Sequence, residues 1–291
     1  MKLTITGYST ALFSTWFFVE ELGLLFDAGD GVSSGLLQKS MKVKHVFISH
    51  ADRDHLGGLL QFNQLNARDG FPIIYYPQDA GSFPAMRDFT TRFDPQSSGS
   101  VWKGIKSNSF ISVKNDLEVE IIKNGHVPVE NDEEKSFSFK VHRVKKKLKP
   151  EFAHLKGLEI KELKEKQGEE FVTEIFRENI FGFSGDSPVE DVHRWDGCKV
   201  LIHEATFIDS EDIKVEAHGN KHSRLEEVIK MVAASDVEQL ILSHFSSRYS
   251  AEHIDKNIRT LCEKYQLKIL VRRILPGELQ TDILQTKAVN E

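Results

Sequence analysis

The stretch that decides the fold is Ile48–Gly58, with the sequence ISHADRDHLGG. It begins at the last residue of the apolar run Val46–Ile48, which has the composition of a buried strand. From Leu56 onward the apolar residues recur at helical spacing. The pattern therefore predicts a buried strand that opens into a polar loop and then a helix. The loop and the start of the helix carry four side chains that bind metals or move protons: His50, Asp52, Asp54 and His55.

The composition is that of an ordinary globular chain. Of the 291 residues, 40% are hydrophobic and 28% are charged, and the net charge of -6 excludes a generally basic surface for coating nucleic acid. Cys198 and Cys262 lie far apart in apolar surroundings, so we expect buried reduced thiols. No signal-peptide pattern or run of about 18 apolar residues is present, which predicts a cytoplasmic protein without membrane contact.

Short apolar strands that end in Asp or His recur along the chain. If the ends of neighbouring strands meet at one edge of a sheet, these side chains form one cluster. Mixed nitrogen and oxygen donors suit zinc, manganese or iron, and such a site can hold two ions. The pattern therefore predicts a metal site built from strand ends. The polar residues that follow the later strands are His126, Asp186, His203–Thr206 and Ser243–Tyr249.

These motifs resemble those of the metallo-β-lactamase superfamily, in the right order and over nearly the whole chain. ISHADRDHLGG resembles its H-x-H-x-D-H signature, and the later motifs resemble its ribonuclease Z branch. The resemblance implies an α+β fold, a four-layer αβ/βα sandwich of two mixed β-sheets with helices outside, in a single domain over residues 1–291. The later motifs are Phe183–Ser187 (F-S-G-D-T in the branch), His203–Thr206 (H-E-A-T), His222-Ser223 (H-S-T) and the histidine motif Leu242–Tyr249.

The resemblance also implies two divalent ions, zinc before manganese or iron. Asp52 stands where the superfamily has its second histidine. Either this carboxylate ligates directly, which favours harder ions or weakens the first site, or it lies beside the site without binding. The implied ligands are His50, Asp52 and a third-motif histidine for one ion, Asp54, His55 and His244 for the other, and Asp186 between them.

The third motif leaves a choice of ligand. The family places its histidine a few residues before a Ser-aromatic-Gly-aromatic strand, which here corresponds to Ser136–Phe139. Asp132 lies at the family distance, His126 lies further upstream, and His142 on the continuing strand is a third choice. We prefer His126, because it directly follows a buried strand and an insertion at residues 129–135 shifts nothing else.

The reaction implied by the resemblance is phosphodiester hydrolysis by a hydroxide that bridges the metals. Asp54 would orient or deprotonate the nucleophile, and His222, steered by Glu204, would protonate the leaving oxygen. The leading substrate is a tRNA precursor, cut at its 3′ end. The alternatives are small phosphodiesters, nucleotides or lactones, and a non-catalytic metal-binding protein whose site Asp52 has eroded. The resemblance alone implies a homodimer.

Two segments lie outside these motifs. Residues 78–109 mix aromatic residues with Pro, Ser and Gly, which predicts an irregular aromatic insertion. Residues 145–178 are charged and predict a projecting arm. The ribonuclease Z branch grips tRNA with a Gly- and Pro-rich arm, but residues 151–171 contain no Pro and only two Gly. The basic run Lys140–Lys149 is either a solvated strand edge or a phosphate-contacting surface.

Overall fold

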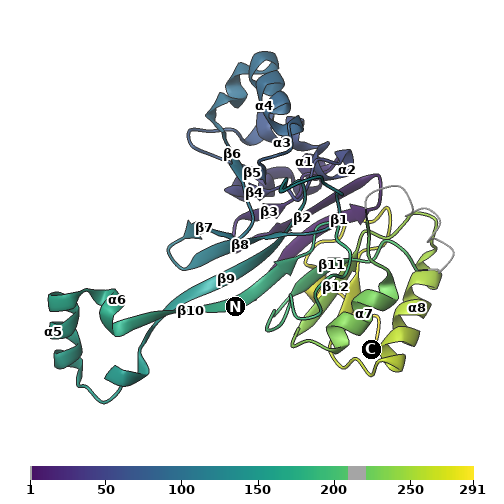
Figure 1. The fold of residues 1–291 in the computed structure, drawn as a ribbon. Helices are drawn as coiled ribbons and strands as arrows, with labels where there is room; N and C mark the ends of the chain where they lie inside the picture. The colour runs from purple at the N-terminus through teal and green to yellow at the C-terminus, as the bar shows by residue number, and fades with distance from the viewer. Residues whose placement is uncertain (1, 209–220) are drawn as a thin grey trace.

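Two mixed β-sheets lie at the centre of the computed structural model, which describes residues 2–208 and 221–291 (Figure 1). The first sheet has the order β1 (Ile5–Thr10), β2 (Ser14–Val19), β3 (Leu24–Phe26), β4 (His45–Phe47), β5 (Ile73–Pro77) and β6 (Val101–Ile105). The second has the order β13 (Leu270–Arg273), β12 (Gln239–Ser243), β11 (Leu201–Glu204), β10 (Thr173–Phe183), β9 (Phe137–Leu148), β8 (Leu117–Lys123) and β7 (Ser109–Lys114).

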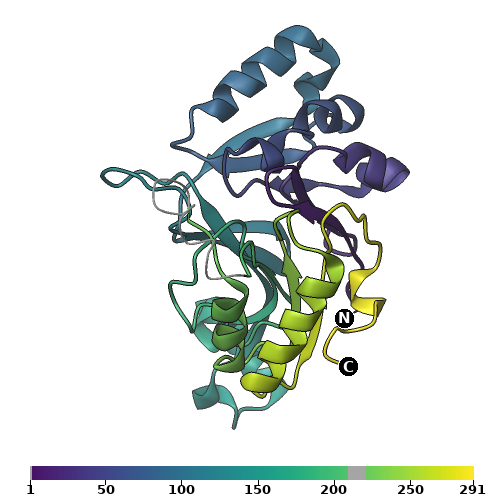
Figure 2. The ribbon, with the colours of Figure 1, turned by 90° about the vertical axis from the view of Figure 1, so that its right-hand side faces the viewer.

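Helices cover the outer face of each sheet (Figures 1 and 2), which confirms the predicted αβ/βα sandwich. Val32, Leu59 and Phe83 pack with the outer side chains of the first sheet. Val228 and Ile254 do the same for the second sheet. The helices are α1 (Val32–Leu36), α2 (Arg53–Leu56), α3 (Leu59–Asn66), α4 (Ser82–Phe93), α5 (Gly157–Gln167), α6 (Glu169–Val172), α7 (Leu225–Ala233) and α8 (Ala251–Lys264), with 3-10 turns at Leu37–Lys42, Pro95–Gly99, Pro150–Phe152 and Ile283–Gln285.

An aromatic layer joins the inner faces of the two sheets. Phe26 on β3 is fully buried and lies at its centre. Aromatic rings at this separation add to the free energy gained from apolar burial. The ring centroid of Phe26 lies 5.9 Å from that of Phe47, 5.9 Å from Phe139, 5.1 Å from Phe181 and 5.5 Å from Phe183.

The directions of the strands bring the polar strand ends together. β3, β4, β5 and β6 are parallel neighbours in the first sheet, and β10, β11, β12 and β13 are parallel neighbours in the second. Parallel strands share an edge for their carboxyl ends, where ligands bind in open α/β sheets. The loops after β4, β10, β11 and β12 therefore leave their sheets on matching edges.

Two local predictions are wrong. The alternation over Lys2–Thr6 predicts a strand that ends at Gly7, but Gly7 lies inside β1 opposite Phe17. A Cβ atom at position 7 would lie 2.3 Å from the Phe17 ring, so glycine makes room for a core aromatic residue. Residues 78–109 are also not irregular, because they contain the 12-residue helix α4 and the strand β6.

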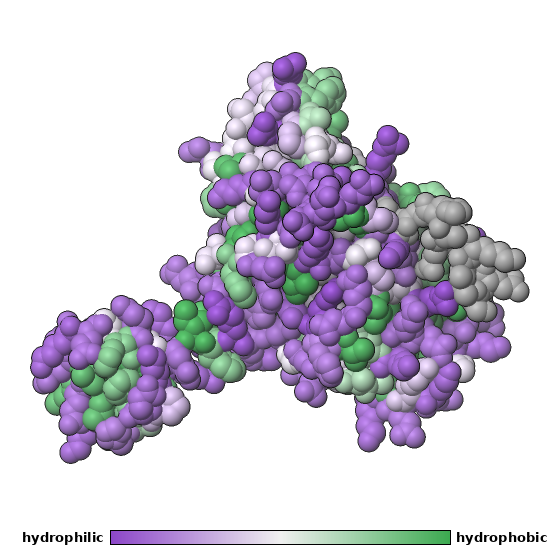
Figure 3. Space-filling view, viewed as in Figure 1, coloured by the Kyte–Doolittle hydropathy of each residue, from purple (hydrophilic) through white to green (hydrophobic). Residues whose placement is uncertain are grey.

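A projecting arm extends from the second sheet (Figure 1). The pairing of β9 with β8 stops at Arg143, whereas its pairing with β10 continues to Leu148. This two-stranded ribbon carries α5 and α6 at its far end. Figure 3 shows apolar side chains among polar ones on the arm, where Leu158 is 78% exposed and Ile175 is 56% exposed.

The basic run lies on β9, which beyond Arg143 pairs with β10 alone, so its later lysines lie on a strand edge, in agreement with the first of the two interpretations. Over residues 145–178 nine Lys and Arg face eight Glu, so the arm is nearly neutral. The lysines contact neighbours within the arm or at its base: Lys145 Nζ lies 2.6 Å from Glu178, Lys146 pairs with Glu169, Lys147 lies 3.4 Å over the Phe176 ring and Lys149 donates a 2.8 Å hydrogen bond to the Phe171 carbonyl.

The two cysteines are free and buried, as predicted. Burial raises the pKa of Cys198 to about 12 and that of Cys262 to about 11, which leaves both thiols protonated at neutral pH. Among the described residues, no helix is long and apolar enough to cross a membrane.

The aromatic layer makes a test of the core. We expect Phe26→Ala to lower the free energy of unfolding by about 3–5 kcal/mol, because it removes a buried ring contacted by four others. Urea unfolding followed by circular dichroism measures this change. Phe89→Ala is the control, since Phe89 is 56% exposed and should cost about 0.5 kcal/mol or less. A loss below about 1 kcal/mol for Phe26→Ala would contradict this account of the core.

Candidate metal centre

Loops from both sheets bring the seven predicted ligands together. The loop after β4 carries His50 and Asp52 and leads into α2, the helix of Asp54 and His55. His126 follows β8, Asp186 follows β10 and His244 follows β12. Every one of these side chains belongs to at least one group whose candidate ligand atoms all lie within 4.8 Å of one another. The structure thus gathers residues spread over nearly 200 positions into one cluster.

The cluster consists of two groups. In the first, Asp52 Oδ2 lies 3.6 Å from His50 Nε2 and 3.7 Å from His126 Nε2. In the second, Asp54 Oδ2 lies 3.5 Å from His55 Nε2 and 3.4 Å from His244 Nε2. Each group therefore offers two imidazole nitrogens and one carboxylate oxygen, a donor set that suits zinc, manganese or iron.

Asp186 lies between the two groups. Its Oδ2 atom is within 3.2–3.9 Å of the Nε2 atoms of all four histidines: His55 at 3.2 Å, His244 at 3.4 Å, His50 at 3.8 Å and His126 at 3.9 Å. Burial raises the pKa of Asp186, but the charges of His244 and His55 outweigh it and hold the pKa well below its usual range. An ionised carboxylate in this position can bridge two cations.

Buried acceptors fix the histidines of the first sheet. His55 Nδ1 lies 2.7 Å from Asp27 Oδ2, and a carboxylate can only accept, so Nδ1 carries the proton. Ser49 donates its hydroxyl to the same Asp27 oxygen at 2.9 Å, so its oxygen accepts from His50 Nδ1, also at 2.9 Å. In both rings the lone pair is therefore on Nε2, which faces the cluster.

The other two histidines are fixed in the same way. His126 Nδ1 donates to the Lys221 carbonyl over 2.7 Å. Thr206 donates its hydroxyl to Glu204 Oε2 at 2.5 Å, so its oxygen accepts from His244 Nδ1 at 2.9 Å. These hydrogen bonds select the tautomer that presents Nε2 as a ligand, as they do in metal sites generally.

The residues present fit a pair of divalent cations. The Nε2 atoms of His50, His55 and His126 are buried and make no hydrogen bond, a cost that a metal ion would remove. Burial and the charges of His55 and His126 lower the pKa of His50, which favours the neutral ring that a metal needs. Burial also lowers the pKa of His55, but Asp186 and Asp27 raise it well above its ordinary value. A metal ion would displace that proton.

The alternatives for the third motif lie elsewhere. Asp132 is exposed in the turn before β9. His142 lies on β9, where its Nε2 is 2.7 Å from Glu120 Oε2 on the neighbouring strand. The structure therefore brings only His126 of the three into the cluster.

Asp52 differs from the other candidate ligands in exposure, since 47% of its side chain is accessible. The neighbouring imidazoles of His126 and His50 hold the pKa of Asp52 well below its usual range. An ionised carboxylate beside two imidazole nitrogens is placed to ligate. Its standing as a ligand remains a prediction.

The partly buried His222 pairs with the buried Glu204 beside Asp186. Glu204 Oε1 lies 3.1 Å from His222 Nδ1, and Glu204 also accepts the Ser187 N–H at 2.8 Å. Burial lowers the pKa of His222, but the charge and hydrogen bond of Glu204 and the charge of Asp186 raise it to about 9. The imidazole therefore stays protonated at neutral pH.

Asp27 and Thr206 position the ligands, yet sequence reasoning gave neither a role. Asp27 begins the acidic and glycine-rich stretch Asp27–Gly31 after a buried strand, a place that suits either a site or a tight turn. Thr206 ends the H-E-A-T motif. The signal for Asp27 was an acidic residue at the end of an apolar strand, the same signal that marked Asp186.

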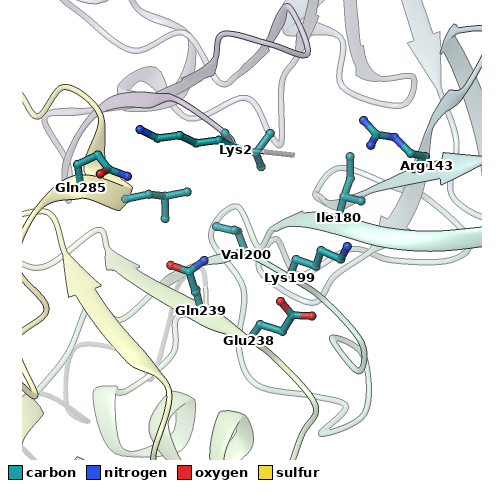
Figure 4. Close-up of a pocket in the computed structure, with 10 residues that line it drawn as sticks. Lys2, Arg143, Ile180, Lys199, Val200, Glu238, Gln239 and Gln285 are labelled. Atoms are coloured by element: carbon teal, nitrogen blue, oxygen red, sulfur yellow. The ribbon is translucent and has the colours of Figure 1, made fainter.

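A separate cavity of about 350 Å³ lies where β11 and β12 begin, opposite the edge that carries the cluster (Figure 4). Lys2, Arg143 and Lys199 face it together with Glu238. Lys199 pairs with Glu178, and Arg143 lies 3.7 Å from Asp116. Lys199 and Arg143 therefore have acidic neighbours, and none of the predicted metal ligands lines this cavity.

Comparison with known proteins gives the class. The sequence model described as the beta-lactamase superfamily domain matches residues 24–245. The fold is similar to the metallo-beta-lactamase fold protein YhfI of Bacillus subtilis, with a TM-score of 0.64 at 14% identity over 96% of this chain and 100% of that one. The chain belongs to the metallo-β-lactamase superfamily, as its motifs predicted, and is a metal-dependent hydrolase of that class.

More similar relatives narrow the class. The chloroplastic tRNase Z of Arabidopsis thaliana is 29% identical over 280 residues, which cover 91% of this chain and 74% of that protein. Ribonuclease Z of Ignicoccus hospitalis is 28% identical over 290 residues, covering 91% and 93%. The short form of human tRNase Z has a TM-score of 0.60 at 19% identity, over 96% and 99%. The chain is therefore in the ribonuclease Z-like branch of the superfamily.

Asp52→Ala tests whether this carboxylate ligates. If it does, we expect one of two Mn²⁺ or Zn²⁺ affinities to fall by more than about 100-fold, because loss of a residue that only supports a ligand costs about 10–100-fold. Isothermal titration calorimetry on metal-stripped protein measures both sites. Arg53→Ala, which removes an exposed neighbour, is the matched control. Equal affinities for the two variants would exclude Asp52 from the site.

Proposed function

We propose that the chain is a two-metal phosphodiesterase that cleaves tRNA precursors at their 3′ end. The observation that carries this proposal is the pair of histidine and carboxylate groups that share Asp186. Zinc is the first choice of metal because imidazole nitrogens dominate the donor set. Manganese and iron are the alternatives, because Asp52 makes the first group richer in oxygen.

The residues of the site have two roles, which are metal binding and orientation of the attacking water. When bound, the two ions would supply Lewis acidity that lowers the pKa of a water molecule and neutralises charge on the phosphate. His50, Asp52 and His126 would hold one ion, and Asp54, His55 and His244 would hold the other, with Asp186 between the two groups. Asp54 also orients the attacking water, and the backbone N–H of Leu12 fixes its Oδ2 atom by a 3.0 Å hydrogen bond.

His222 protonates the leaving oxygen. Glu204 engages Nδ1 of the ring at 3.1 Å, so Nε2 is the nitrogen that remains for the substrate. Glu204 is itself held by Ser187 and Thr206, so the pair has little freedom to turn. A partly buried acid held in this way is suited to donate a proton to an alkoxide, which is a poor leaving group.

His222→Ala separates this role from metal binding. We expect RNA cleavage to slow by about 10²–10⁴-fold, the usual contribution of a general acid. Hydrolysis of bis-p-nitrophenyl phosphate should slow by less than about tenfold, because nitrophenolate leaves without a proton. Initial rates with both substrates and equal metal loading measure the difference. Equal losses for the two substrates would remove His222 from the proton transfer.

Small phosphodiesters, nucleotides or lactones are the second candidate class, because the arm is nearly neutral and offers little electrostatic attraction to RNA. In support of RNA, relatives named ribonuclease Z or tRNase Z align with most of the chain. The membership of the chain in a class of metal-dependent hydrolases argues against the non-catalytic alternative. Homodimerisation and cytoplasmic localisation remain predictions.

Replacing residues 149–172 by a short Gly-Ser turn tests the arm as an RNA-binding element. We expect tRNA affinity to fall about tenfold or more, and the slope of log affinity against log salt to fall by about 0.9 for each lost phosphate contact. Hydrolysis of bis-p-nitrophenyl phosphate should not change, because the arm projects away from the metal edge (Figure 1). Filter binding over a salt series measures both quantities. Unchanged tRNA affinity in a folded variant would favour the small-substrate class.

A further inference from the structure

A second cavity, of about 430 Å³, lies beside the metal centre on the outer side of the first sheet. The turn between β1 and β2 supplies Phe13, whose side chain is 63% exposed at its rim. Tyr8 and Trp16, which face each other across the same two strands, line the cavity with it. Leu279 contributes a further apolar surface. Three of the nine residues that line the cavity are therefore aromatic.

The lining of this cavity is suited to a neutral ring rather than to a phosphate group. Neither Lys nor Arg is found among the described residues that line it. Asp30 and Ser34 are its exposed polar members, and the negative charge of Asp30 repels an anion. A carboxylate can instead accept a hydrogen bond from an exocyclic amine. The exposed face of Phe13 is available for stacking on a planar ring.

Trp16 supplies an independent observation. Its side chain is 1% exposed, and its indole Nε1 has no hydrogen-bond partner. Most buried donors are satisfied, so an unsatisfied one needs an explanation. α1 packs closely on this ring, because a Cβ atom at Gly35 would lie 2.6 Å from it. α1 therefore fixes the indole ring as one wall of the cavity, with Nε1 buried.

The cavity is joined to the metal centre by the turn itself. Leu12 has a left-handed backbone with φ 69°, and its N–H donates to Asp54 Oδ2 over 3.0 Å. The Ala11 N–H is held by the Phe245 carbonyl at 3.2 Å, one residue after His244. Phe13 follows directly on Leu12. When the phosphate of a substrate lies at the metal centre, the adjacent group of that substrate can therefore reach Phe13 and the cavity.

We propose that this cavity binds a nucleobase of the substrate, from the nucleotide next to the cleaved phosphodiester. Phe13 stacks on the base, and the Trp16 ring forms a wall of the cavity beside it. Asp30 accepts from its exocyclic amine where one is present. The inference rests on the proposed function for the identity of the substrate, but the binding itself requires no catalysis.

The first test pairs enzyme variants with matched substrates. Short RNA is compared with the same RNA carrying an abasic ribose on the 5′ or the 3′ side of the cleaved bond. For the unaltered enzyme we expect kcat/KM to be about tenfold lower with one of the two abasic substrates, which lies within the range found for base stacking. In Phe13→Ala and in Ser34→Tyr, which fills the mouth, this ratio should fall to near one.

The second test measures binding without cleavage. Chelator-treated protein is titrated with the intact RNA while tryptophan fluorescence is recorded. We expect quenching that disappears in Trp16→Phe but persists in Trp102→Phe, with affinity about tenfold lower in Phe13→Ala. Thermal unfolding checks that each variant is folded.

The outcomes separate the two proposals. If RNA is cleaved but abasic substitution costs the same in all the variants, the base pocket is wrong and the phosphodiesterase stands. If no RNA is cleaved but RNA quenches Trp16 as described, the pocket stands and the reaction class falls. Absence of any Trp16-dependent quenching overturns the pocket whatever the activity.

Discussion

The carboxylate of Asp27 is the constraint on which the metal centre depends. It is fully buried at the end of β3 and accepts hydrogen bonds from His55 Nδ1 and from both the N–H and the hydroxyl of Ser49. Through Ser49 it also fixes His50, so one side chain sets the tautomer of a histidine in each group. A buried charge is stable only when it is supplied with donors in this way. Loss of this carboxylate would therefore free both rings and leave their donors without an acceptor.

The packing of the two sheets is the second constraint, because neither sheet carries a complete site. The first sheet provides His50 and His55, whereas His126, Asp186 and His244 come from the second. Asp186 Oδ2 lies near all four histidines only because the two sheets pack in one fixed relative position. The aromatic layer around Phe26 maintains that position, so the packing of the core determines the geometry of the candidate ligands. Left-handed backbones at Asp27 and His244 fit this view, since strain concentrates at functional sites.

The fold class came from the resemblance of the motifs to a known superfamily. Local pattern was enough for the strand ends and for the preference for His126, because these follow from apolar runs that stop at polar residues. It failed where a distant partner decides. Gly7 lies inside β1 because a glycine leaves room there for the ring of Phe17 on the neighbouring strand. Residues 78–109 contain the helix α4, which packs Phe83 against the first sheet. The roles of Asp27 and Thr206 depend on hydrogen bonds to histidines 28 and 38 residues away. A sequence read without pairing partners does not contain that information.

Asp52 can be understood from what the histidines require. Each imidazole needs an acceptor at Nδ1 so that its Nε2 lone pair faces the metal, and the structure provides four such acceptors, three of them on buried residues. A carboxylate has no tautomer to select, so it needs no anchor of this kind. It can therefore occupy the position whose side chain is 47% exposed, where a buried acceptor for a histidine would be harder to provide. The substitution of Asp for His at this position is thus compatible with a working two-metal site.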